Sequence, residues 1–314
     1  MNFINNKLET IHLASPQGFC AGVASAIEIV DLALEKYGTP LYVRHHIVHN
    51  TTVIKDFENK GVTFIEQLNE VPPNSVVVFS AHGTPPDEYK LAKERDIKII
   101  DATCPLVTKI HREAVRFSKK NVQTVLIGHN GHQEMIGTSG YVNADLLYIV
   151  ENESDVEKLN LNPDQPIGFL TQTTLSVDDT KNIIKKLKER YPTISAPPKA
   201  DICYATTNRQ EAVKDLVKNC DIIIVCGSRE SSNSNRLKET AKLKGVESYI
   251  IDTVDELDIN WLKDKKSLGI TSGASVPKKV VDNLLAKLTS VFPNVQIHYL
   301  NNAEHGIKFP IPNI

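Results

Sequence analysis

The chain has 314 residues, enough to bury a substantial core, and its length suggests two or three domains. Hydrophobic residues make up 41% and charged residues 24%, as in an ordinary globular protein. The formal net charge of −2 gives no support for a nucleic-acid surface, which would need a basic stripe. No apolar run approaches the ~20 residues that cross a bilayer, so we expect neither a nucleic-acid partner nor a membrane partner.

Apolar runs alternate with amphipathic helical patterns along almost the whole chain. The strand candidates, in chain order, are residues 11–14, 41–48, 76–80, 97–101, 122–128, 146–150, 167–171, 221–227, 248–252, 268–272 and 295–300. The helical patterns between them include residues 23–38, 106–120, 178–191, 206–219 and 276–292. Strands separated by helices of this length predict an α/β fold with parallel sheets and helical crossovers.

Three cysteines, Cys20, Cys104 and Cys203, each lie where an apolar or connecting segment ends and a helix begins. They divide the chain into lengths of about one small domain each. We therefore expect three α/β units that repeat one plan without repeating a sequence: residues 1–103, 104–202 and 203–314. The Pro-rich stretch "SAPPKAD" precedes the third cysteine as a connector, and an irregular tail is expected from residue 301.

Polar residues gather after the predicted strands. His49, His82 and His132 all follow strands, and the run "SRESSNSNR" at 228–236 combines a helix cap with an anion site. Ligands of parallel sheets bind beyond the carboxyl ends of the strands. Because neither a P-loop nor a G-x-G-x-x-G motif is present, these residues favour a small phosphorylated substrate over a nucleotide.

The five cysteines fall into two classes. Cys220 and Cys226 are expected to be small buried hydrophobes, whereas the three junction cysteines open helices, where the dipole favours thiolate. Since the N-terminus has no signal peptide pattern, we expect a cytoplasmic protein without disulfides. Three thiolates suit an iron–sulfur cluster or zinc, and a [4Fe–4S] cluster with three cysteine ligands keeps one open iron.

Several stretches of the chain are highly specific: "GFCAGV", "IVHN", "FIEQ…EVP", "FSAHG", "DATCPLVTK", "TQTTLSVDDT", "DICYATTNRQEAV", "SSNSNRL" and "GAS". With these stretches in this order, the chain resembles the LytB/IspH family of 4-hydroxy-3-methylbut-2-enyl diphosphate reductases from about Ile11 to about Ser275. The resemblance implies three pseudo-symmetric α/β units around a central [4Fe–4S] cluster, held by Cys20, Cys104 and Cys203. It also implies reductive loss of an allylic hydroxyl, with flavodoxin or ferredoxin as the electron donor.

The same resemblance implies the site residues. Glu134 matches the proton donor, and Thr173 is expected beside the substrate hydroxyl. The diphosphate pocket is implied to consist of His49, His82, His132, Ser231, Ser232, Asn233 and Ser275. The chain departs from the family pattern at Gln133, where proline is expected, and at the apolar Met135 and Ile136, which makes the stiffness of this loop an open question.

Two other functions compete with this interpretation. One is a zinc hydrolase or deaminase, because "HQE" at 132–134 satisfies H-x-E; such enzymes also need a C-x-x-C, which the chain lacks. The other is an iron–sulfur electron carrier or redox sensor. Proteins of that kind commonly use four cysteines and need no phosphate-binding residues.

Overall fold

The structure is a computed structural model that describes residues 8–300, 306–312 and 314. The chain divides into two compact units. Unit 1 comprises the described residues among 1–20, 49–55 and 204–307. Unit 2 comprises those among 21–48, 56–203 and 308–314.

Unit 1 contains one five-stranded parallel sheet, in the order β10-β9-β11-β1-β12. Its strands are β1 (Thr10–Leu13), β9 (Ile222–Cys226), β10 (Glu247–Ile251), β11 (Ser267–Ser272) and β12 (Gln296–Tyr299). Its helices are α8 (Tyr204–Leu216), α9 (Ser232–Leu243) and α10 (Lys278–Val291). Helix α2 (Thr51–Asn59) begins in this unit and ends in unit 2.

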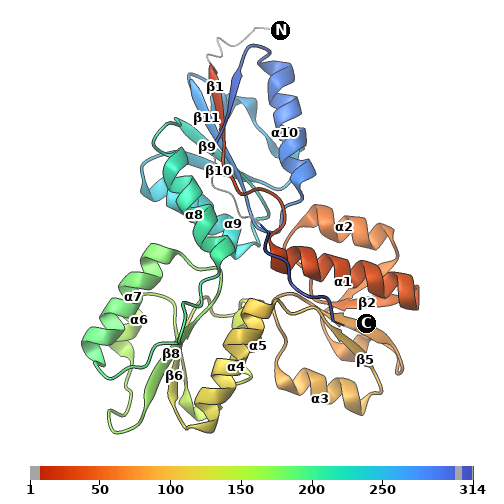
Figure 1. Cartoon of the computed structure of the whole chain (residues 1–314), viewed down its shortest axis with the longest axis vertical. Helices are drawn as coiled ribbons and strands as arrows, with labels where there is room; N and C mark the ends of the chain where they lie inside the picture. The colour runs from red at the N-terminus through yellow and green to blue at the C-terminus, as the bar shows by residue number, and fades with distance from the viewer. Residues whose placement is uncertain (1–7, 301–305, 313) are drawn as a thin grey trace. The chain divides into compact units, whose positions relative to one another are not determined.

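Helices cover both faces of the unit 1 sheet (Figure 1). Ile222 and Ile224 of β9 pack in the same core cluster as the apolar residues of α10, whereas Ile223 packs with those of α8 and α9. Alternate residues of β9 therefore enter opposite cores. A strand buried on both faces is an unbroken apolar run, which explains the sequence "IIIVC".

Unit 2 contains two parallel sheets, of order β3-β2-β4-β5 and β7-β6-β8. The strands are β2 (Leu41–Arg44), β3 (Val62–Ile65), β4 (Val76–Phe79), β5 (Lys98–Asp101), β6 (Gln123–Ile127), β7 (Leu147–Val150) and β8 (Ile167–Thr171). The helices are α1 (Ala21–Tyr37), α3 (Pro86–Glu94), α4 (Pro105–Lys119), α5 (Gln133–Ser139), α6 (Glu153–Lys158) and α7 (Val177–Arg190).

Short 3-10 turns complete the two units, at Leu68–Glu70, Ala144–Leu146, Val254–Glu256 and Ile259–Leu262. In unit 2, α6 and α7 pack on one face of strand β6, through Val125 and Ile127, while α4 packs on the other face through Leu126. None of the helices described is long and apolar enough to cross a membrane.

The α/β class with parallel sheets is confirmed, with two departures in the strands. The strand expected at 41–48 ends at Arg44, because His45 adopts a left-handed backbone conformation with φ 56°. Strand β3 was not predicted; it is a four-residue edge strand with one exposed position, so its apolar signal is short.

The three sheets draw mainly on the three expected chain segments. Strand β1 is the exception, because it pairs with β11 and β12 in the sheet of the last segment. The domain boundaries at 103/104 and 202/203 stay a prediction. The predicted tail falls partly outside the described residues, at 301–305 and 313; residues 306–312 and 314 form no helix or strand.

Candidate functional site

Two junction cysteines of unit 2 have the same backbone geometry. The amide of Cys104 donates to the carbonyl of Ala81 at 3.0 Å, and the amide of Cys203 donates to the carbonyl of Thr173 at 3.1 Å. Each acceptor lies two residues beyond the last residue of its strand, β4 or β8. Both cysteines are therefore fixed at the carboxyl end of a parallel sheet, where ligands of such sheets bind.

Cys20 repeats this arrangement in unit 1. Its amide donates to the carbonyl of Ala274 at 3.0 Å, and Ala274 again lies two residues beyond the end of its strand, β11. Each acceptor also marks a predicted binding residue: His82 follows Ala81, Ser275 follows Ala274, and Thr173 is itself one. The same backbone hydrogen bond therefore recurs at each of the three cysteines that the sequence places before a helix.

The five thiols divide as expected. Cys20, Cys104 and Cys203 are half-buried, and each directly precedes the first residue of a helix, α1, α4 or α8. Cys220 and Cys226 lie in hydrophobic clusters, where burial raises the pKa of each thiol to about 12. A buried thiol with such a pKa is a poor metal ligand, because the thiolate is the form that binds.

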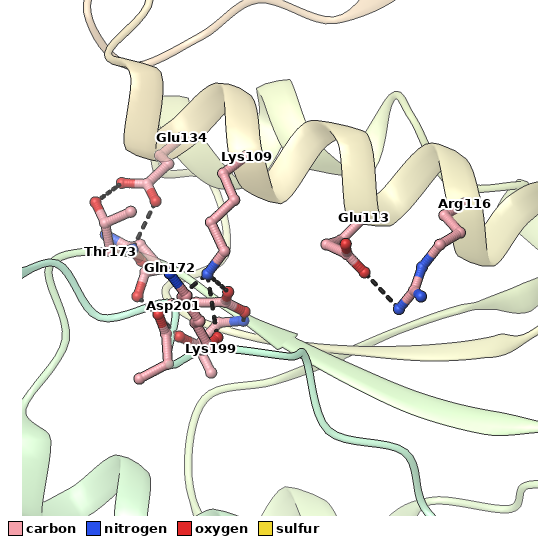
Figure 2. A network of polar contacts seen from close by, with 10 residues as sticks. Lys109, Glu113, Arg116, Glu134, Gln172, Thr173, Lys199 and Asp201 are labelled. Atoms are coloured by element: carbon pink, nitrogen blue, oxygen red, sulfur yellow. Dashed lines mark hydrogen bonds and ion pairs between the residues drawn. The ribbon is translucent and has the colours of Figure 1, made fainter. Parts of the chain in front are cut away.

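Glu134 and Thr173 of unit 2 are joined by two hydrogen bonds. Glu134 is 3% exposed; its Oε1 accepts from the backbone amide of Thr173 at 2.6 Å and its Oε2 from the Thr173 hydroxyl at 2.8 Å (Figure 2). Burial raises the pKa of Glu134 to about 7, although the two hydrogen bonds from Thr173 oppose this rise. The carboxyl group therefore gains and loses a proton near neutrality.

His132 caps the helix that carries Glu134. Its Nδ1 accepts from the Glu134 amide at 3.2 Å, which leaves Nε2 to carry the proton of a neutral ring. The ring of His82 lies 6.0 Å from it, centroid to centroid, at 87°. The two predicted diphosphate ligands of unit 2 are thus neighbours.

Glycines allow the loop that carries His82 to pack tightly. A Cβ on Gly83, whose φ is +87°, would lie 2.5 Å from Cε1 of the buried His111. A Cβ on Gly137 of α5 would lie 2.9 Å from the carbonyl oxygen of Gly83, so both glycines are needed for this close approach.

The two apolar departures from the family pattern differ in their surroundings. Met135 is 1% exposed and packs in the core, whereas Ile136 is 45% exposed. Helix α5 is therefore anchored by Met135.

Three of the predicted polar residues of unit 1, Ser231, Ser232 and Asn233, lie at the start of α9. Ser231 caps this helix, its Oγ accepting from the Ser234 amide at 3.3 Å, and Ser232 is the first helical residue. Asn233 is 5% exposed, yet among the described residues neither atom of its side-chain amide has a hydrogen-bonding partner. The Ser275 hydroxyl donates to the carbonyl of His49 at 3.1 Å. Buried polar groups are normally paired, so Asn233 indicates a ligand position.

The predicted site residues fall into two groups. Unit 2 contains Cys104, Cys203, His82, His132, Glu134 and Thr173; unit 1 contains Cys20, His49, Ser231, Ser232, Asn233 and Ser275. That the two groups form one site stays a prediction.

Sequence reasoning missed an ion pair in unit 2 between a half-buried lysine, Lys109, and a buried aspartate, Asp201. Lys109 Nζ lies 3.2 Å from Asp201 Oδ1, and Asp201 Oδ2 accepts from the Thr171 amide at 3.1 Å (Figure 2). The Asp201 side chain is fully buried, which raises its pKa against the lowering effect of Lys109. A lysine on an amphipathic helix and an aspartate in a connector look like solvated charges, and the one available sequence signal is that Asp201 lies two residues before Cys203.

Comparisons with known proteins agree with one another. Residues 11–289 match the sequence model described as LytB protein. The chain is 47% identical to a 4-hydroxy-3-methylbut-2-enyl diphosphate reductase of Histophilus somni, over 96% of each chain. It is 49% identical to 4-hydroxy-3-methylbut-2-enyl diphosphate reductase 2 of Bradyrhizobium diazoefficiens, over 96% of this chain and 97% of that one.

A solved structure is similar over nearly the whole chain. It is the E-1-hydroxy-2-methyl-but-2-enyl-4-diphosphate reductase from Plasmodium falciparum, with a TM-score of 0.94 and 39% identity, and the match covers 97% of this chain and 96% of that one. The α/β fold with its three parallel sheets is therefore shared with a solved reductase.

Proposed function

The chain belongs to the LytB protein family, and from this membership we propose that it is a 4-hydroxy-3-methylbut-2-enyl diphosphate reductase. The reaction consumes two electrons and two protons, releases the allylic hydroxyl as water, and yields isopentenyl and dimethylallyl diphosphate. It is the last step of the non-mevalonate isoprenoid pathway. The structural observation that carries the proposal is the recurring hydrogen bond from each junction cysteine to a carbonyl at a strand end.

Cys20, Cys104 and Cys203 are proposed as the three protein ligands of a [4Fe–4S] cluster at the centre of three pseudo-symmetric units. Their fit rests on their chemistry, because they are half-buried thiols that directly precede helices, where thiolate is favoured. When bound, the cluster would supply electrons singly and offer one open, Lewis-acidic iron to the substrate hydroxyl.

The diphosphate group is proposed to bind His49, His82, His132, Ser231, Ser232, Asn233 and Ser275. The best support comes from Asn233, whose buried amide lacks a partner among the described residues. Both Asn233 and Ser232 lie in the first turn of the twelve-residue helix α9, and the amino-terminal end of a helix dipole attracts anions. His132 is included with His82 because the centroids of the two rings lie 6.0 Å apart.

Glu134 is proposed as the proton donor to the departing hydroxyl, with Thr173 orienting both groups. A general acid works best when its pKa lies near the operating pH, and the pKa of about 7 meets this requirement. The support for this role is that the Thr173 hydroxyl donates to Glu134 Oε2 at 2.8 Å, and the same oxygen would accept a hydrogen bond from the substrate hydroxyl.

An external protein must deliver the electrons, and a flavodoxin or ferredoxin is proposed for this role. A cytoplasmic location is part of the same proposal, because none of the five cysteines forms a disulfide, which is the usual state of cysteines in a reducing compartment.

The alternatives receive less support. A zinc hydrolase or deaminase would need a C-x-x-C motif, which the sequence lacks, and the relatives are named as reductases. An electron carrier or sensor would have no use for a buried, unpartnered amide at a helix start.

The direct test is anaerobic purification followed by an assay with a reduced viologen dye and 4-hydroxy-3-methylbut-2-enyl diphosphate. We expect protein-bound iron and sulfide, and formation of both isopentenyl and dimethylallyl diphosphate. Protein that contains zinc without iron, or iron-loaded protein that leaves the substrate intact, would overturn the proposal.

A further inference from the structure

Lys109 connects the helix that follows one cysteine to the backbone that precedes another. It lies on α4, five residues after Cys104, and its Nζ donates to the carbonyl of Lys199 at 3.1 Å and of Ala200 at 3.2 Å. Its third contact is Asp201 Oδ1 at 3.2 Å (Figure 2). An ammonium group has three donors, and three acceptors just before Cys203 surround this one.

Arg209 makes the same kind of connection in unit 1. It lies on α8, six residues after Cys203, and is 1% exposed. Its two terminal nitrogens donate to the carbonyl of Ala205 at 3.1 Å and to the carbonyl of Gly18 at 3.0 Å. Gly18 lies two residues before Cys20 and has a φ of +77°, a backbone conformation that glycine adopts without strain.

The two connections share one logic. In each, a cation in the second turn of the helix that follows a cysteine binds backbone carbonyl oxygen in the segment leading to a different cysteine, at Lys199 and Ala200 for Lys109 and at Gly18 for Arg209. At Lys109 the connection extends further, because Asp201 Oδ2 also accepts from the amide of Thr171, the last residue of strand β8. The residues before Cys203 are thus held from the helix side and from the strand side. Hydrogen bonds to charged groups are stronger than neutral ones, which suits them to this task.

We propose that Lys109 and Arg209 are positioning residues that hold the segments leading to Cys203 and Cys20 in the geometry that thiolate ligation requires. This inference rests on the proposed ligation of a cluster by the junction cysteines. Neither residue is a catalytic residue, because each contacts backbone and, at Lys109, a buried carboxylate.

Lys109 allows the cleaner test, because its side chain is 32% exposed and its loss leaves the helix intact. Lys109→Met removes the ammonium group but keeps the aliphatic chain. Lys119→Met is the matched control, an exposed lysine in the last turn of the same helix. Arg209→Lys supplies a second variant that keeps the charge but loses the two-pronged contact, in case a neutral residue there prevents folding.

Hydrogen exchange of the full-length, anaerobically purified protein is the first measurement. We expect amides 199–203 to exchange about tenfold faster in Lys109→Met than in the wild type, with no change in Lys119→Met and none in strand β9. Arg209→Lys should accelerate exchange in residues 17–20 instead. Unchanged exchange of residues 199–203 in Lys109→Met would overturn the proposal.

The rate at which an iron chelator bleaches the protein is the second measurement, and it reports on the ligands without turnover. Lys109→Met should lose iron at least about tenfold faster than Lys119→Met. Faster exchange with an unaltered rate of iron loss would contradict a role in ligation. If the wild type itself takes up no iron, the proposed function fails, whereas the exchange measurement still decides whether Lys109 holds the segment.

Discussion

Thr173 binds both oxygens of the Glu134 carboxylate, one through its amide at 2.6 Å and the other through its hydroxyl at 2.8 Å. The carbonyl of the same threonine accepts the amide of Cys203. One residue therefore fixes a buried carboxyl group and the backbone of a proposed cluster ligand. Because both hydrogen bonds from Thr173 act on the pKa of Glu134, substituting either residue should change how turnover depends on pH.

The pKa of Glu134 predicts an alkaline limb in the pH profile of turnover. Burial raises this pKa to about 7, so the acid form is present below pH 7 and is lost above it. With the reductant in excess, turnover should fall about tenfold per pH unit above this pKa. Glu134→Gln should lower kcat at least about a hundredfold while changing KM little, and its residual rate should lack this limb.

The surface carboxylate of Glu153 provides the control, since Glu153→Gln should leave both the rate and the pH profile unchanged. Turnover of Glu134→Gln equal to that of the wild type would remove Glu134 from the mechanism.

Thr173→Val should move the alkaline limb to higher pH. The Thr173 hydroxyl lowers the pKa of Glu134 by stabilising the carboxylate, so its removal leaves the charged form with the backbone amide alone. The rate will also fall, because the group that orients the substrate hydroxyl is lost. The quantity to compare is the pH at which the alkaline limb begins. A shift of this limb towards acidic pH would contradict the conclusion that the Thr173 hydroxyl lowers the pKa of Glu134.

Asn233→Ala should weaken binding of the diphosphate without destabilising the fold. The amide has no partner among the described residues, so its removal deletes no intramolecular hydrogen bond. We expect KM to rise about tenfold or more and the urea midpoint to stay constant or increase. Asn235→Ala is the contrast, because Asn235 Nδ2 donates to the carbonyls of Arg229 and Ser231, and its loss should lower the urea midpoint. The reverse pattern would assign Asn233 to the fold alone.

Gly83→Ala should destabilise the protein by more than its backbone conformation accounts for. Gly131→Ala is the matched control: both glycines have positive φ, +87° and +81°, but a Cβ on Gly131 meets nothing within 4 Å. The control should cost about 1 kcal/mol for backbone strain, and Gly83→Ala a further ~1–3 kcal/mol for the clash with His111. Thermal unfolding measures the difference, and equal costs would show that the contact with His111 is soft.

The sequence predicted those features that short, contiguous stretches encode. Strand β9 is an unbroken apolar run and is buried on both faces, so its apolar residues alone reveal it. Strand β3 was not predicted, because it has only four residues at a sheet edge, one of them exposed, and so gives too short an apolar signal in the sequence. The junction cysteines were recognisable since each lies next to a helix start.

Contacts between distant residues were not predictable in this way. Thr173 and Glu134 are 39 positions apart, and Lys109 and Asp201 are 92 apart. Nothing in "PLVTKIHREAV" distinguishes Lys109 from the solvated lysines of other helices. Its role depends on where the backbone before Cys203 passes, which only the tertiary structure determines.

The central claim is that Cys20, Cys104 and Cys203 together hold one iron–sulfur cluster, and iron content tests it most directly. Iron and acid-labile sulfide should be measured in anaerobically purified wild type, in the serine variants of these three cysteines, and in Cys220→Ala as the buried control. We expect about four irons per chain in the wild type and in Cys220→Ala, and loss of most iron in each serine variant. Full iron content in Cys104→Ser would contradict the claim.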